Sequence, residues 1–74
     1  MSERQDLNTY MFKGNKLNVV FLTGTETPTR TDVPSGTFCV IDAIGEVYDH
    51  DVWIYADLTT PGTYVWTLVH NNTA

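Results

Sequence analysis

The sequence predicts an all-β fold: a small antiparallel sandwich or barrel of four to five strands with an extended N-terminal arm. Two observations lead to this prediction. Short runs of β-branched, aliphatic and aromatic residues alternate with segments rich in glycine, proline and threonine, which is typical of strands joined by turns. No stretch of the chain has the apolar period of roughly 3.6 residues that marks an amphipathic helix.

The expected strands begin after residue 16. Residues 17–24 are apolar on both faces, so we expect this strand to be covered on both sides. Residues 25–36 contain threonines, prolines and a glycine but few apolar side chains, and we expect them to form a long loop. Further strands are expected at residues 37–42, 46–48, 52–58 and 63–69, with a polar break at residues 49–51 and a Pro-Gly turn at residues 60–63.

The chain is expected to form one domain with an arm. Residues 1–16 are polar and irregular, and we place them outside a single small β domain of residues 17–74. Domains of this size bury only about 60% of their unfolded surface and usually rely on disulfides, a metal or a partner subunit. The chain has one cysteine and no pattern with zinc spacing. By elimination, the sequence indicates association with copies of itself or with another protein.

The charge distribution disfavours nucleic acid as a partner. The net charge is −5, and all four basic residues lie within the first thirty positions, so the rest of the chain cannot neutralise phosphates. No apolar run approaches the roughly 20 residues of a membrane span, and the chain does not start like a signal peptide. A basic N-terminal segment and an acidic remainder would suit head-to-tail contacts between identical subunits, although solvated charge is the more ordinary interpretation.

Asp49, His50 and Asp51 form a polar triplet between apolar residues, which raises the question of a site. Successive strand residues point to opposite faces, so the three would converge only in a turn. Calcium needs more oxygen ligands, and zinc would have only Cys39 and His70 as further donors. We therefore predict a solvated hairpin tip whose aspartates accept local backbone hydrogen bonds, with no metal, cofactor or catalytic residue. Cys39 lies in an apolar run and is expected to be a buried side chain.

Aromatic residues form the other notable group. Trp53, Tyr55, Tyr64 and Trp66 fall on two consecutive expected strands, where they can form a cross-strand ladder. We expect about half of them in the core and the remainder at a subunit interface. The predicted interface residues are Tyr10, Phe12, Trp53, Tyr55 and Trp66.

The run VPSGTFCVIDAIGEVYDHDVWIYAD, residues 33–57, resembles a pattern of small structural proteins of tailed bacteriophages. In that pattern a proline-glycine turn leads into a strand with Ile-Asp, then a glycine-centred turn, then a strand with Val-Tyr and a tryptophan. The matching positions are Pro34, Gly36, Ile41, Asp42, Gly45, Val47, Tyr48 and Trp53. The Asp-His-Asp insertion before the tryptophan departs from it. The resemblance implies a virion component, such as a head decoration or accessory protein, a head–tail joining piece or part of a fibre, and it brings no catalytic residues.

Together these observations predict a non-enzymatic structural protein that assembles into a larger particle, which the resemblance implies is a phage virion. Its partners would be copies of itself or other virion proteins, such as a capsid or tail protein, after synthesis in the host cytoplasm. The alternative is a carbohydrate- or peptide-binding β-module, for example in a tail or fibre, that uses exposed Trp53, Tyr55 or Trp66.

Overall fold

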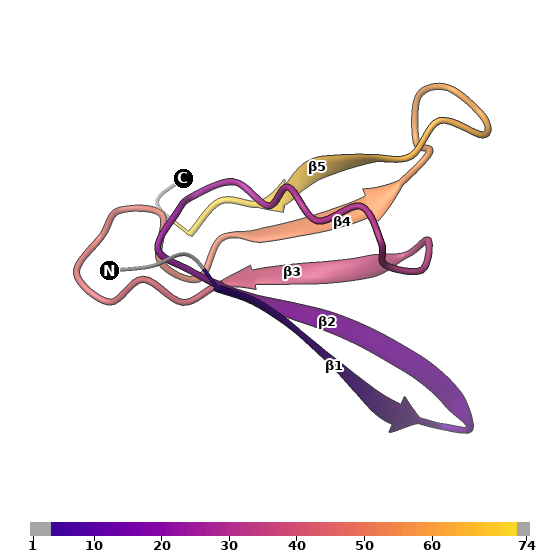
Figure 1. The fold of residues 1–74 in the computed structure, drawn as a ribbon, viewed down its shortest axis with the longest axis horizontal. Helices are drawn as coiled ribbons and strands as arrows, with labels where there is room; N and C mark the ends of the chain where they lie inside the picture. The colour runs from indigo at the N-terminus through magenta and orange to yellow at the C-terminus, as the bar shows by residue number, and fades with distance from the viewer. Residues whose placement is uncertain (1–3, 73–74) are drawn as a thin grey trace.

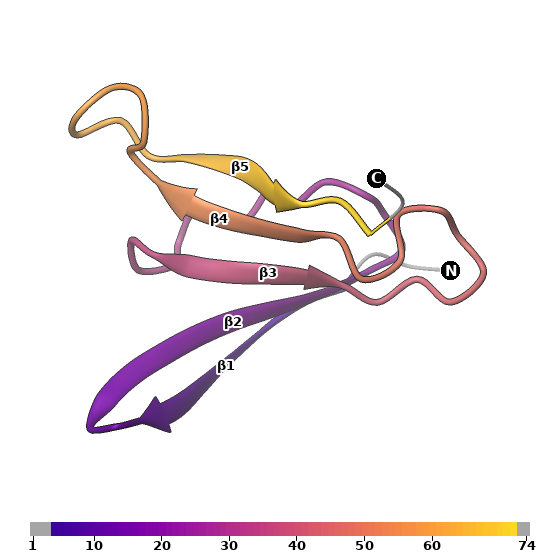
Figure 2. The same ribbon diagram turned by 180° about the vertical axis from the view of Figure 1, so that it is seen from behind.

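The computed structural model describes residues 4–72, which form one five-stranded sheet and no helix (Figures 1 and 2). The predicted all-β class and strand number are confirmed. The first three residues of the predicted arm lie outside the described part of the chain. The strands lie side by side in chain order in an open sheet. They are β1 (Arg4–Phe12), β2 (Asn15–Thr23), β3 (Thr37–Ile41), β4 (Val52–Ala56) and β5 (Val65–His70).

The segment predicted as an N-terminal arm is extended, but most of it is a strand of the sheet. β1 pairs antiparallel with β2 along its whole length. Lys13 and Gly14 join the two strands with φ of 52° and 80°, the left-handed conformations that a two-residue type I′ turn requires. The domain boundary that we predicted at residue 16 therefore falls inside β2, and the arm is not separate from the β domain.

The sheet is mixed rather than purely antiparallel, because β2 and β3 run parallel. A parallel pair needs a connection that returns to the starting end of the sheet. Residues 24–36 provide that connection without a helix or strand, which confirms the predicted loop. We call this segment the strap. It passes in front of β4 and β5 in Figure 1 and behind them in Figure 2, so it covers one face of the sheet.

Residues 46–48 do not form a strand, so that prediction was wrong. They belong to a loop with successive turns between β3 and β4. The Glu46 N–H donates to the Ala43 carbonyl at 2.9 Å, and the Asp49 N–H donates to the Glu46 carbonyl at 3.2 Å. These local hydrogen bonds occupy backbone groups that a strand would offer to its neighbour.

The connection between β4 and β5 contains the predicted turn. The Thr63 N–H donates to the Thr60 carbonyl at 3.0 Å, and Gly62 has a φ of 84°. This is the conformation that a Pro-Gly centre favours in a type II turn, with the glycine at the position of positive φ. Here the local sequence was sufficient to predict the backbone.

The core lies between the sheet and the strap. Val20, Leu22, Cys39 and Ile41 are fully buried on the covered face, and Val33 of the strap is buried against them. The strap therefore takes the place of the second sheet in the predicted sandwich. Half-buried apolar side chains surround this cluster, among them Leu7, Trp53, Tyr55 and Trp66.

Candidate functional site

The Asp49-His50-Asp51 triplet is a structural turn whose side chains do not converge on one site. Asp49 Oδ1 accepts the Ala43 N–H at 2.8 Å and closes the loop before it. Asp51 is buried, and its Oδ1 accepts the Asn72 N–H at 2.9 Å, which fixes the segment after β5. His50 has a φ of 69° and an exposed side chain, with Nδ1 3.6 Å from Asp49 Oδ2. The prediction of local backbone hydrogen bonds is confirmed for Asp49 but not for Asp51, whose partner Asn72 is distant in the sequence, and the triplet is not a solvated tip.

Cys39 lies in the middle of the sheet, where it is fully buried as a free thiol. Burial raises the pKa of this thiol to about 12, so the thiolate that a nucleophile needs does not form near neutral pH. The expected role as a buried side chain is confirmed. Within residues 4–72 no group of three His, Cys, Asp or Glu side chains is arranged to hold a metal ion.

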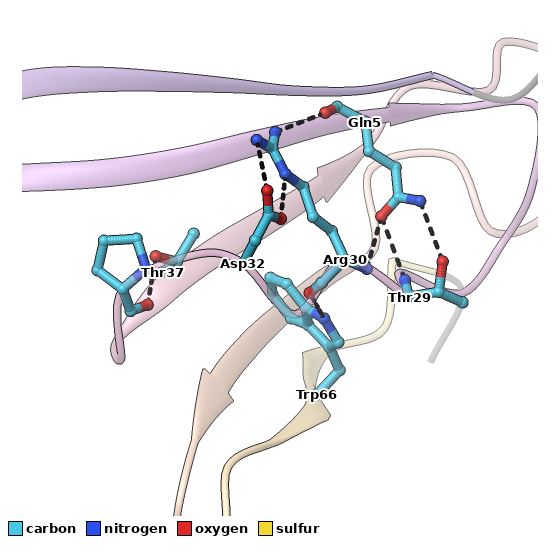
Figure 3. A network of polar contacts seen from close by, with 7 residues as sticks. Gln5, Thr29, Arg30, Asp32, Thr37 and Trp66 are labelled. Carbon is cyan, nitrogen blue, oxygen red and sulfur yellow. Dashed lines mark hydrogen bonds and ion pairs between the residues drawn. The ribbon is translucent and has the colours of Figure 1, made fainter.

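The strap is fastened to both edge strands of the sheet (Figure 3). At β1, Gln5 Oε1 accepts the N–H groups of Thr29 and Arg30 at 3.2 and 2.9 Å, and Arg30 Nη1 donates to the Gln5 carbonyl at 3.0 Å. At β5, Trp66 Nε1 donates to the Arg30 carbonyl at 2.8 Å. Arg30 also pairs with Asp32 at 2.6 Å, and this hydrogen bond raises the pKa of Arg30 and lowers that of Asp32. Arg30 therefore links the strap to both edges.

The aromatic residues predicted at an interface fall on both faces of the sheet. Trp53, Tyr55 and Trp66 lie on the face that the strap covers, where the Tyr55 and Trp66 rings are 5.2 Å apart. Tyr10 and Phe12 lie towards the far end of β1, on the other face, and are 48% and 56% exposed. Of the five, Tyr10 and Phe12 present the most ring surface to a partner.

The face opposite the strap has no covering segment within residues 4–72, and we call it the open face. In Figure 2 no other segment of the ribbon lies in front of β3, β4 and β5. Tyr10 and Val65 on this face are 48% and 47% exposed, whereas Val19 is buried by its neighbours in the sheet and Ile54 near the centre is shielded in part. Strand alternation and register assign these apolar side chains to it: Tyr10, Phe12, Leu17, Val19, Phe21, Phe38, Val40, Val52, Ile54, Ala56 and Val65.

The open face is nearly free of charge. Among the strand residues that point to it, only Arg4 and Asp6 are charged, and they pair with each other at 3.0 Å. Strand lengths of five to nine residues give it a flat area of about 500 Å². The chain exposes 4968 Å², more than the roughly 4600 Å² expected of a compact protein of 8.3 kDa. An area of this size is comparable to the largest apolar patch on a typical monomer, which is often functional.

One sequence signal pointed to this surface without locating it. The run of residues 17–24 is apolar on both sides, which predicted cover on both sides. The structure covers the side that carries Val20 and Leu22 and leaves the side of Phe21 open. Within residues 4–72, the Phe21 side of β2 is therefore an apolar surface without a covering segment.

Comparisons with known proteins add no family to this description. Within residues 4–72 the structure has no helix with the length and apolar character needed to cross a membrane. No protein-family model, curated protein or solved structure matches the chain.

Proposed function

We propose that this chain is a non-enzymatic structural protein that assembles with copies of itself into a larger particle. The observation that carries this proposal is the open face, which is apolar, nearly uncharged and uncovered. Because an apolar surface in water is unfavourable in proportion to its area, association that buries this face is favourable. No chemical step is needed for this role.

The occupant of the open face is a second copy of the chain. Two sheets that face each other about 10 Å apart form a β-sandwich, and a twofold axis brings the same apolar patch from both copies together. The flat area of about 500 Å² on each side is close to the lower end of specific interfaces, about 600 Å² per partner. The sandwich that the sequence predicted within one chain is completed in this way by two chains.

A virion is the particle that we propose for this assembly. The support is the resemblance of residues 33–57 to small structural proteins of tailed bacteriophages. In that setting the chain is a head decoration or accessory protein, made in the host cytoplasm, whose partners include a capsid or tail protein. The contact between copies is the part of this proposal that rests on the structure itself.

Sedimentation velocity over a range of concentrations tests the proposal. The wild-type chain should sediment as a dimer or larger species, and Ile54→Asp should raise the dissociation constant about 100-fold or more, because it places a charge in the apolar contact. Val65→Asp is a second variant. It should change the free energy of unfolding of the isolated chain little, because Val65 is already 47% exposed. Thr59→Asp, in the exposed connection between β4 and β5, is the matched control and should assemble like the wild type.

Two results would overturn the proposal. One is a wild-type chain that remains monomeric at every concentration. The other is a folded Ile54→Asp or Val65→Asp variant, verified by its circular dichroism spectrum, that assembles as tightly as Thr59→Asp.

A further inference from the structure

The hairpin of β1 and β2 projects beyond the rest of the sheet. β3 pairs with β2 only from Val19 onward, so Asn15–Asn18 and the opposing part of β1 extend about 13 Å past it. In both views the hairpin diverges from β3, β4 and β5 and ends in open space (Figures 1 and 2). This projecting end exposes Met11 by 67% and Phe12 by 56%.

The same end carries two lysines, Lys13 and Lys16. Both arginines are paired, Arg4 with Asp6 and Arg30 with Asp32. Within residues 4–72 no carboxylate lies within ion-pair distance of Lys13 or Lys16. Lys13 instead lies over the Phe12 ring, with Nζ 5.7 Å from the ring centroid. We call residues 11–16 the hairpin tip: an apolar end with two positive charges.

A cavity with complementary properties lies where β2 and β3 end. It has a volume of about 420 Å³, and Ala43, Ile44 and Tyr48 provide its apolar walls. Asp42 and Glu46 also line it, and no cation of residues 4–72 pairs with either of them. Ile44 is 90% exposed, so the wall is incomplete in the isolated chain. We call this cavity the acidic pocket.

Carboxylates act on Tyr48, which lines the acidic pocket. Burial, Glu46 and Glu26 all raise the pKa of Tyr48, which keeps its hydroxyl neutral. A third carboxylate, that of Glu26, therefore acts on the same place. A cationic apolar group is the occupant that this combination favours, since it supplies both the missing counter-charge and the missing apolar contact.

The hairpin tip and the acidic pocket lie at opposite ends of the molecule. β2 begins at the hairpin tip and ends at Thr23, which lines the pocket. Figures 1 and 2 show the tip and the connection between β3 and β4 at opposite sides of the ribbon. The tip of one chain therefore cannot reach its own pocket.

We infer that the hairpin tip of one copy inserts into the acidic pocket of the next copy, so that copies join end to end. Phe12 or Met11 fills the cavity, and Lys13 and Lys16 face Asp42 and Glu46. This inference rests on the proposed assembly function and adds a second contact to the open face. A contact between two different surfaces is heterologous, so repetition gives a ring when the rotation closes and a filament when it does not.

Charge reversal with mixing tests this contact. The first variant carries Lys13→Asp and Lys16→Glu, where aspartate suits the positive φ of residue 13. The second carries Asp42→Lys and Glu46→Lys. Each variant alone should form only the species that the open-face contact gives. Its end-to-end association should be about tenfold weaker or more, because the tip and the pocket then carry charges of the same sign. An equimolar mixture should restore larger species, since each tip then meets a pocket of opposite sign.

Further measurements separate this contact from that of the open face. Raising the ionic strength from about 0.01 M to about 1 M shortens the Debye length from about 30 Å to about 3 Å, so it should weaken end-to-end growth and leave the open-face contact intact. Met11→Ser, at a residue of the hairpin tip that does not belong to the open face, should weaken the same growth without a change in charge. Ile54→Asp should abolish the open-face contact and leave end-to-end growth.

The outcomes distinguish the two claims. If the wild type assembles and both charge-reversed variants alone form the same large species, the end-to-end contact is refuted while the open-face proposal stands. If the variants lose large species and the mixture does not regain them, complementarity of tip and pocket is also refuted. A wild type that is monomeric throughout refutes both claims.

Discussion

The two faces of this sheet have similar apolar side chains and different surroundings. On one face Val20, Leu22, Cys39 and Ile41 are fully buried because the strap covers them. On the other face no segment within residues 4–72 covers Phe21 and its neighbours. The difference does not come from the strands themselves, since β2 contributes large apolar residues to both faces. It comes from thirteen residues of loop, 24–36, which can lie over only one of them.

This comparison separates two uses of apolar surface in a small protein. The covered face holds the core of the single chain, and the open face is the surface through which we propose that copies associate. Within residues 4–72, one loop covers one side of the five-stranded sheet and no segment covers the other. Completing the second side with another copy is an economical solution, and substitutions on the two faces should therefore have effects of different kinds.

The largest expected effect is a difference between matched truncations on the two faces. Leu22→Ala should lower the free energy of unfolding of the monomer by about 2–5 kcal/mol, because it leaves a cavity in the covered core. Ile54→Ala should cost less than about 1.5 kcal/mol in dilute solution, where its side chain is only half-buried. Urea unfolding at low protein concentration measures both values. Equal costs would show that the open face is as important to the single chain as the core.

The next effect is the pH dependence of stability that the buried Cys39 thiol causes on the covered face. The ordinary pKa is 9.0 and burial raises it to about 12, so above pH 9 the unfolded thiol ionises while the folded thiol stays neutral. The stability that this group contributes is complete below pH 9 and is lost as the pH rises to about 12, at about 1.4 kcal/mol per pH unit.

A comparison with Cys39→Ala isolates this contribution, because the variant keeps every other titrating group. The alkaline decline in unfolding free energy should be steeper for the wild type than for Cys39→Ala. Parallel declines would mean that Cys39 is not desolvated and that the covered face is open to water.

The smallest expected effect concerns the fastening of the strap. Trp66→Phe removes the hydrogen bond to the Arg30 carbonyl and should cost about 1 kcal/mol more than Trp53→Phe. Trp53 is a matched control on the same face, since its Nε1 is buried without a hydrogen-bond partner among residues 4–72. Hydrogen exchange should accelerate at the N–H groups of Thr29 and Arg30 in Trp66→Phe alone. Unchanged exchange there would show that the strap is held from β1 only.

The sequence predicted the strands whose local pattern and turns agree. Residues 37–41 and 65–70 are runs rich in β-branched, aliphatic and aromatic side chains, and the turn at residues 60–63 has proline and glycine at the positions that a type II turn favours. β1 was missed as a strand because an edge strand with exposed residues needs no apolar alternation, and because its turn uses Lys13-Gly14 rather than the more common Asn-Gly.

The parts that could not be predicted depend on long-range contacts. A long polar loop between two strands is compatible with either an antiparallel or a parallel pair, and the contacts of Arg30 with Gln5 and Trp66 are the ones that lay the strap across the sheet. The residues at 46–48 have strand-forming side chains, but the side chain of Asp49 holds this loop in its turns. The open face depends on both features, so it was visible only as a strand that is apolar on both sides.

Hydroxyl-radical footprinting of both faces as a function of protein concentration tests the central claim most directly. As the concentration rises, labelling of Phe21, Phe38 and Ile54 on the open face should fall, while labelling of Tyr55 and Trp66 on the covered face should stay constant. Labelling of the open face that does not change up to the highest concentration would contradict the account, because that face would then have no partner among copies of this chain.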